Sequence, residues 1–210
     1  RGMYDGALQH LSNDESFMKR YSGVELTGVD IDIRPIPSSS SSSNKVIQAR
    51  ERLSSSMNGN RDIPVSFHAV SGDVVKGLPF PDNYFDAITC SLVFCSVSDQ
   101  ITALEEVKRV LNTNRGSGGT FGYVEHVAVN LSNDEERKRR SFLEWQQRVL
   151  DPLQQAVAHN CHLHRETDEI ISKVFGVGSF DGVELLEGER FFVDGMWPVS
   201  CQCKGVVKYI

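Results

Sequence analysis

Apolar and polar residues alternate along this chain with two periods, which predict strands and helices that follow one another. Period-two segments rich in branched and aromatic residues predict strands, and apolar residues spaced three and four apart predict helices. The predicted strands are residues 24–31, 64–70, 84–93 and 121–127, and the predicted helices are residues 4–20, 44–57, 98–111 and 134–158. Strands that alternate with helices indicate an α/β fold with a largely parallel sheet.

The last fifty residues have a different pattern. A short helix is predicted first, followed by three strands that Gly and Asp turns separate, at residues 167–174, 183–186, 190–193 and 200–209. Strands joined by short turns predict an antiparallel edge of the sheet. Two local features are also expected, namely Ser98 as the N-cap of the third helix and a kink or restart of the fourth helix at Pro152.

Composition limits the number of domains and the cellular setting. The chain has 210 residues, of which 40% are apolar and 24% charged, and this fits one globular domain over residues 1–210. Six consecutive serines lie at residues 38–43, and a segment so poor in apolar surface predicts a flexible loop over residues 36–44. The five cysteines are odd in number and irregularly spaced, which favours a reducing compartment over a disulfide framework.

Charge and hydropathy argue against two partners for this chain, namely nucleic acid and a lipid membrane. The formal net charge of −6 argues against a nucleic-acid partner, because nucleic-acid-binding surfaces are normally basic. The basic run at residues 137–140 follows two glutamates, so a solvated helix face is favoured over an RNA or lipid patch. The first twenty residues are too polar for a signal peptide, and no apolar run approaches the ~20 residues of a membrane-spanning helix. We therefore expect this chain to be soluble.

Acidic residues follow two of the predicted strands, at the end of a sheet where open α/β folds bind their ligands. Asp30 lies at the end of the first strand, where a carboxylate can accept hydrogen bonds from both hydroxyls of a ribose. Asp73 follows the second strand, and its carboxylate can accept a hydrogen bond from an exocyclic amine such as that of adenine. The alternative is that both acids only cap turns.

The segment that begins at Gly72 and Asp73 carries a specific motif. From Gly72 to Ile88 the sequence GDVVKGLPFPDNYFDAI follows the pattern GDxxxLPFxDxxFDxV, with one extra residue before the LPF. It resembles the S-adenosylmethionine (SAM)-dependent methyltransferases of the ubiquinone and menaquinone biosynthesis type, the methyltransferase type 11 group. Further segments resemble more closely the methyltransferase-like proteins that methylate small alkyl thiols: SLVFCSVSDQ, LEEVKRVL, GGTFGYVEHV, WQQRVLDPLQQ and NCHLHRET.

The resemblance implies a fold and a cofactor. The fold is a Rossmann-like sheet with helices on both faces and an antiparallel C-terminal edge, and the cofactor is SAM. The acceptor is expected to be a small, lipophilic molecule, for example an alkyl thiol. The residues expected to bind the cofactor are Asp30, Gly72, Asp73, Val74, Ser91 and Leu92.

Methyl transfer from a sulfonium is an in-line displacement, so alignment and exclusion of water can supply much of the catalysis. A thiol acceptor reacts as its thiolate, which a nearby cationic or hydrogen-bonding group favours. His126, at the end of a predicted strand, is the candidate for this role, and Glu125 either orients it or binds SAM. The alternative is that His126 caps the strand. No metal is expected, because the resemblance implies none here and the spacing of ligands at residues 159–164 matches no usual zinc pattern.

One part of the family pattern does not occur in the chain. The first strand and its glycine loop, E-x-G-x-G-x-G, are absent from the sequence, and Gly2 stands where the end of that loop is expected. We therefore expect the sequence to begin inside the loop, with any membrane-anchoring segment upstream of it. The full-length protein is then cytoplasmic or associated with an intracellular membrane. An inactive fragment or pseudoenzyme, and less favourably a nicotinamide-dependent dehydrogenase, are the alternatives.

Overall fold

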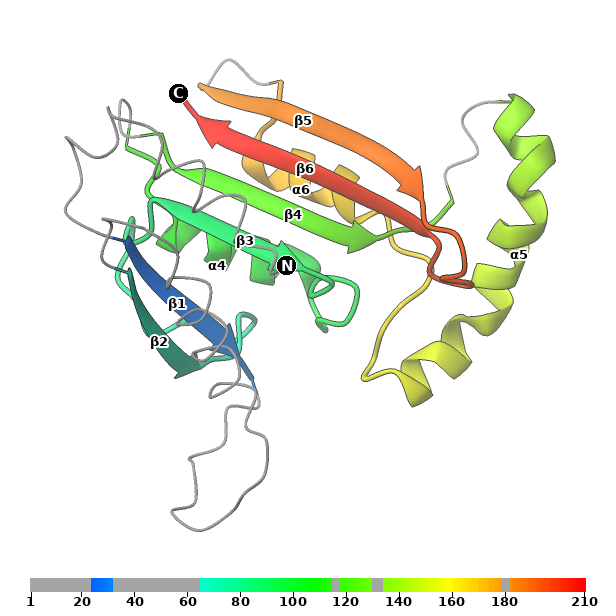
Figure 1. Cartoon of the computed structure of the whole chain (residues 1–210), viewed down its shortest axis with the longest axis horizontal. Coiled ribbons are helices and arrows are strands. Elements are labelled where there is room, and N and C mark those ends of the chain that lie inside the picture. The colour runs from blue at the N-terminus through cyan, green and yellow to red at the C-terminus, as the bar shows by residue number, and fades with distance from the viewer. Residues whose placement is uncertain (1–23, 32–64, 115–117, 130–133, 179–181) are drawn as a thin grey trace, which may run out of the picture. The chain divides into compact units, whose positions relative to one another are not determined.

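The computed structural model describes residues 24–31, 65–114, 118–129, 134–178 and 182–210 (Figure 1). They belong to two compact units, residues 1–73 and residues 74–210, and each unit is described by itself. The helices expected at residues 4–20 and 44–57 and the loop expected at residues 36–44 lie outside the described residues, as does Gly2. A single domain over residues 1–210 stays a prediction.

The first unit contains two parallel strands. Strand β1 is Val24–Asp30 and strand β2 is Val65–Ser71, and they pair in register from Val24 opposite Val65 to Asp30 opposite Ser71. Both strands confirm the sequence prediction. Because the strands are parallel, their carboxyl ends meet at one edge, and the backbone N–H of Gly72 donates to the carbonyl oxygen of Asp30 at 3.2 Å.

The second unit is built on a four-stranded sheet in the order β3-β4-β6-β5 (Figure 1). Strands β3, Ala87–Ser91, and β4, Thr120–His126, are parallel. Strand β6, Cys201–Tyr209, runs antiparallel to β4 and to β5, Val183–Phe192. The α/β class and the antiparallel C-terminal edge are therefore confirmed. The prediction of two strands at residues 183–193 is wrong, because one strand continues through a register shift between Leu185 and Glu187.

Two helices cover one face of this sheet, and a third lies beside the end of β4 (Figure 1). Helices α4, Gln100–Val110, and α6, Thr167–Phe175, contact each other, and α6 also contacts β4 and β6. The predicted N-cap at Ser98 is wrong. Asp99 caps α4 instead, since its carboxylate oxygen Oδ1 accepts the backbone N–H groups of the second and third residues that follow it.

Helix α5 is Asp134–Val157, one continuous helix that contains Pro152. The restart allowed at Pro152 is wrong, and the C-terminal half of the helix bends in Figure 1. Proline removes one backbone hydrogen bond and crowds the preceding turn, so a bend without a break is a physically reasonable outcome. In the part of the chain that the structure describes, no helix is both long and apolar enough to cross a membrane.

The core of the second unit lies between the sheet and helices α4 and α6. Phe121 of β4 is fully buried at its centre and stacks on Phe175 of α6, with 5.0 Å between ring centroids. The ring of Phe94 meets Phe121 edge to face at 6.2 Å. Cys201 and Cys203 are both about 1% exposed and belong to this core. The core thus packs against β4 and against the loop that follows β3.

Candidate active site

The carboxyl edge of the first unit brings three predicted cofactor residues together. Asp30 ends β1, and Gly72 and Asp73 directly follow β2. The hydrogen bond from the Gly72 N–H to the Asp30 carbonyl holds the carboxyl ends of β1 and β2 side by side. Open α/β sheets bind their ligands at the carboxyl ends of the strands, and an acidic residue there can bind a ribose hydroxyl. Val74 belongs to the second unit, where it packs partly buried against the core.

The carboxyl edge of β3 and β4 carries the other predicted residues. Ser91 ends β3 and pairs with Val124, one position before Glu125 and His126 at the end of β4. Leu92 turns the chain away from the strand with a positive φ of 56°, and its N–H donates to the carbonyl of Val124 at 2.9 Å. A left-handed conformation is uncommon for a leucine, so the chain turns sharply where the site is expected.

Glu125 is fully buried and holds the loop that follows β3. Its oxygen Oε1 accepts the backbone N–H groups of Val93 and Phe94 at 2.7 and 3.1 Å, and Oε2 accepts that of Cys95 at 3.2 Å. Burial raises the pKa of the Glu125 carboxyl, and the three N–H donors oppose that rise. In this arrangement the carboxylate positions a loop through its backbone.

His126 is also buried, at 3% exposure. Its ring nitrogen Nε2 lies 2.8 Å from Sγ of Cys161, a hydrogen-bond distance, whereas Nδ1 is buried without a hydrogen-bond partner. Burial lowers the pKa of His126 to about 4, and the nearby positive charge of Arg165 acts in the same direction. The ring is therefore neutral at pH 7 and can act as a hydrogen-bonding group rather than as a cation.

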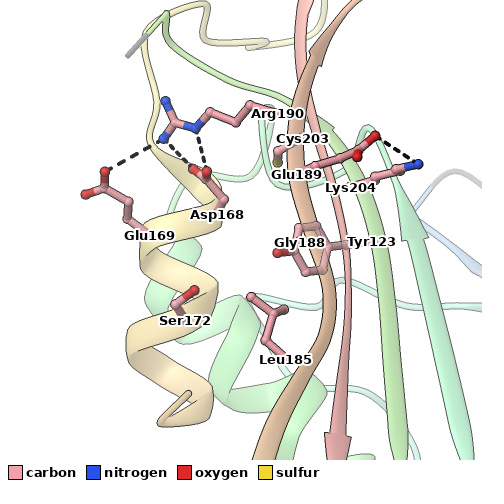
Figure 2. A pocket seen from close by; sticks show the side chains of 10 residues that line it. All are labelled: Tyr123, Asp168, Glu169, Ser172, Leu185, Gly188, Glu189, Arg190, Cys203 and Lys204. Carbon is pink, nitrogen blue, oxygen red and sulfur yellow. Dashed lines mark hydrogen bonds and ion pairs between the residues drawn. The ribbon is translucent and has the colours of Figure 1, made fainter. Parts of the chain in front are cut away.

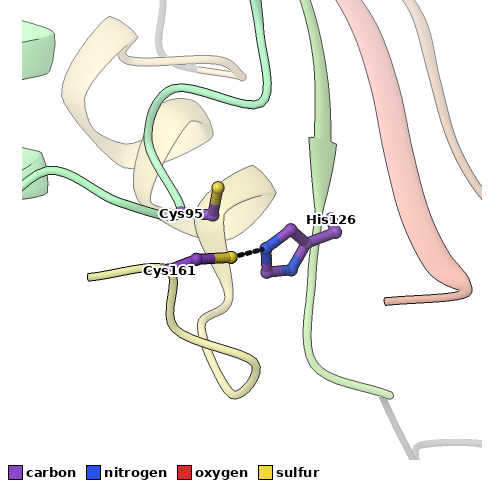
Figure 3. Close-up of side chains that lie close together, drawn as sticks. All are labelled: Cys95, His126 and Cys161. Carbon is purple, nitrogen blue, oxygen red and sulfur yellow. Dashed lines mark hydrogen bonds between the residues drawn. The ribbon is translucent and has the colours of Figure 1, made fainter. Parts of the chain in front are cut away.

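The sequence prediction missed that His126 has two cysteines beside it. One ring nitrogen of His126 and the sulfur atoms of Cys95 and Cys161 lie within 4.8 Å of one another (Figure 3). The three residues come from segments far apart in the chain, so no local spacing could have revealed the cluster. Cys95 itself is 2% exposed.

Helix α4 fixes the loop that carries the LPFPD part of the motif. The guanidinium of Arg109 donates to the carbonyl oxygens of Leu78 and Phe80 at 3.2 and 2.9 Å and to the carboxylate of Asp82 at 2.7 Å. Glu106 pairs with the same guanidinium at 2.7 Å and accepts the Leu78 N–H at 2.6 Å. The planar fork of arginine suits several acceptors at once. The motif is thus held by the helix that follows it.

A hollow of about 390 Å³ lies elsewhere, between α6 and strands β5 and β6 (Figure 2). Arg190 makes two bonds to Asp168 at 2.6 and 2.8 Å, and Lys204 meets Glu189 at 3.0 Å. These charges pair with each other across its rim. None of the predicted cofactor or catalytic residues lines this hollow.

Comparison with known proteins agrees with the motif. The methyltransferase domain family matches residues 15–115. A rat thiol S-methyltransferase, TMT1B, is 36% identical over 122 residues, which are 58% of this chain and 44% of that protein. A human thiol S-methyltransferase, TMT1A, is 40% identical over 86 residues, which are 41% of this chain and 30% of that protein. The chain thus spans less than half the length of these relatives.

Solved structures show the same fold. A SAM-dependent methyltransferase from Methanosarcina mazei superimposes with a TM-score of 0.52 over 95% of this chain and 88% of that chain, at 15% identity. The [4+2]-cyclase SpnF superimposes with a TM-score of 0.50 over 98% of this chain and 80% of that chain, at 16% identity. Since a cyclase also has this fold, the fold alone does not define the reaction. The chain is thus similar to methyltransferases in the segment that the domain family matches and to thiol S-methyltransferases over about half of its length, and its fold is that of the Rossmann-like SAM-dependent methyltransferases.

Proposed function

We propose that the protein transfers a methyl group from SAM to a small, lipophilic thiol. The observation that carries the proposal is the pair of carboxylates, Asp30 and Asp73, at one carboxyl edge of two parallel strands, in a chain similar to thiol S-methyltransferases. The residues fit the nucleoside part of SAM, because one carboxylate can accept from the ribose hydroxyls and the other from the adenine amine.

The donor supplies an electrophilic methyl group on a sulfonium. In the proposed reaction a bond forms between the acceptor sulfur and the methyl carbon, the bond from the sulfonium to that carbon breaks, and the acceptor proton leaves to solvent. S-adenosylhomocysteine departs as a neutral thioether, so the leaving group needs no acid. The chain has to align the two sulfur atoms and exclude water from between them.

The loop after β3 is the proposed wall of the acceptor site. Glu125 holds this loop by three backbone hydrogen bonds, so we assign it the role of a positioning residue. His126 is neutral and presents Nδ1 without a protein partner, and this nitrogen is the proposed contact for the acceptor thiol. Cys95, His126 and Cys161 are buried there, so an acceptor bound beside them would leave water, which favours a lipophilic molecule.

Methyl transfer to an alkyl thiol tests the proposal. We expect the protein in its complete natural form, given SAM and a small alkyl thiol, to yield the methyl thioether and S-adenosylhomocysteine in equal amounts. Asp30→Ala removes hydrogen bonds to a charged acceptor, worth about 1.5–3 kcal/mol. The KM for SAM should therefore rise about 10- to 150-fold.

Glu25→Ala is the matched control. Glu25 is the other carboxylate of β1, near its opposite end, where it faces His68 at 3.5 Å. Its removal should leave the KM for SAM unchanged. No methyl thioether from a folded protein would contradict the proposed acceptor, and an Asp30→Ala variant with the wild-type KM would contradict the ribose assignment.

A further inference from the structure

Two thiols and one imidazole form a buried cluster at the end of β4 (Figure 3). Cys95 comes from the loop after β3, His126 from the last position of β4, and Cys161 from the segment after α5. None of the three is more than 9% exposed. Thiolate sulfur and imidazole nitrogen are the ligands that Zn²⁺ prefers in proteins, and a set of three leaves one position of a tetrahedral ion for water or another ligand.

The segments that carry these ligands are bonded to one another. The backbone N–H of His162 donates to the carbonyl of Cys95 at 2.8 Å, and the side-chain amide of Asn160 donates to the carbonyl of Ser96 at 3.0 Å. The Cys95 N–H is held in turn by Glu125 at 3.2 Å. The two cysteine-bearing segments are therefore fixed against each other before any ion binds, which lowers the entropy lost on binding.

The backbone before Cys161 has an unusual conformation. His159 and Asn160 both have positive φ values, of 51° and 62°. Two consecutive left-handed residues other than glycine are uncommon, and such conformations gather at binding and catalytic sites. Here they turn the chain at the end of α5, and the Cys161 sulfur faces the ring of His126 (Figure 3).

We propose that Cys95, His126 and Cys161 bind one Zn²⁺ ion, through two thiolates and the ring nitrogen Nε2. Both thiols lose their protons to solvent when the ion binds. Zinc bond lengths and tetrahedral angles require about 3.6 Å between nitrogen and sulfur and about 3.8 Å between the two sulfurs. Without the ion, a hydrogen bond holds Nε2 of His126 and Sγ of Cys161 2.8 Å apart. The ion would replace this hydrogen bond, and the two atoms would move apart to the longer distance.

Only one proposed ligand, Cys161, comes from residues 159–164, the segment whose His and Cys residues suggested a metal site in the sequence. In residues 159–164, His162 lies 3.7 Å from Asp151 and His164 lies 3.4 Å from Glu144, so these histidines face other partners. The expectation of no metal rested on the spacing within that segment and on the family resemblance. The proposed site instead draws its other two ligands from the ends of β3 and β4.

A metal titration of the reduced wild-type protein tests the site directly. After chelation and buffer exchange, Co²⁺ should bind at about one ion per chain and give the charge-transfer absorption of thiolate ligands. Zn²⁺ should displace it, and Mg²⁺, which prefers oxygen ligands, should not. A folded, reduced protein that neither retains zinc nor develops the cobalt band would overturn the proposal.

Variants locate the ion. Cys161→Ser should weaken the affinity for Zn²⁺ at least about tenfold and reduce the thiolate band by about half. Cys90→Ser, which changes a cysteine of β3 outside the cluster, should leave both unchanged. An unchanged band in Cys161→Ser would also overturn the assignment, and circular dichroism shows whether each variant is folded. The readout is metal content, so the result is independent of methyl transfer.

Discussion

Replacement of Glu125 by glutamine probes the loop that walls the proposed acceptor site. Glu125 is fully buried, and its two oxygens accept three backbone N–H groups of residues 93–95. Glu125→Gln keeps the size of the side chain but removes its charge and replaces one oxygen by an NH₂ group. In the better orientation of the amide, the oxygen keeps Val93 and Phe94, and the NH₂ group faces the N–H of Cys95.

The magnitude follows from these contacts. One buried N–H is left without an acceptor, which costs about 1–3 kcal/mol. The two remaining hydrogen bonds lose the contribution of an ionised acceptor, about 1 kcal/mol together, because charge-assisted bonds are roughly twice as strong as neutral ones. The free energy of unfolding should therefore fall by about 2–4 kcal/mol, a large part of the stability of an ordinary domain.

Urea unfolding followed by circular dichroism measures the change. Glu189→Gln is the control, since Glu189 is 59% exposed and pairs with Lys204 at 3.0 Å at the surface. That change should lower the free energy of unfolding by less than about 1 kcal/mol. If Glu125→Gln were as stable as the wild type, Glu125 would carry a proton in the folded protein, and its assignment as an ionised acceptor of three hydrogen bonds would be refuted.

Two further changes test the packing of the second unit. Phe121→Ala empties the centre of the aromatic core and should lower the free energy of unfolding by about 3–5 kcal/mol, whereas Phe142→Ala, at a position 67% exposed, should change it by less than about 0.5 kcal/mol in the same urea assay. Arg190→Met leaves the carboxylate of Asp168 without its two hydrogen bonds, so the free energy of unfolding should fall by about 1–3 kcal/mol and the thermal midpoint with it. Lys204 is more exposed, and Lys204→Met should barely change the thermal midpoint.

The strands that the structure describes were predicted well where periodicity and turn residues agree. Strands β1, β2 and β4 each lie within two residues of their predicted bounds, because branched and aromatic residues alternate along them and polar residues follow their ends. The antiparallel edge was also predicted, from short turns between strands. These features depend on local sequence, which periodicity reads directly.

Errors arose where tertiary contacts override a local signal. Glu187, Gly188 and Glu189 looked like a turn, but the chain passes through them as a shifted register within β5. A Cβ atom at Gly188 would lie 2.7 Å from Cδ2 of Leu185, so a larger residue there would make that side chain move; the glycine lies within β5 and not in a turn. Ser98 and Asp99 are both good N-cap residues, and only backbone geometry distinguishes them.

The cofactor site stays a prediction. Asp30 was singled out by its place at the end of a strand and Asp73 by the family motif, and the parallel register brings the ends of their strands to one edge. The cluster of Cys95, His126 and Cys161 lay beyond prediction, because its members are brought together by β4 and by the chain after α5. Cys95 and Cys161 lie far apart in the sequence and share no motif, so their proximity is visible only in the folded chain.

Calorimetric titration with S-adenosylhomocysteine tests the central claim that these strand ends form a SAM site. We expect the protein in its complete natural form to bind it with measurable heat. Asp73→Ala should weaken that binding at least about tenfold, because a hydrogen bond to a charged group is lost. Cys161→Ala, which changes no strand end, should keep the wild-type affinity. No detectable heat from a folded protein, or an Asp73→Ala variant with wild-type affinity, would contradict the account.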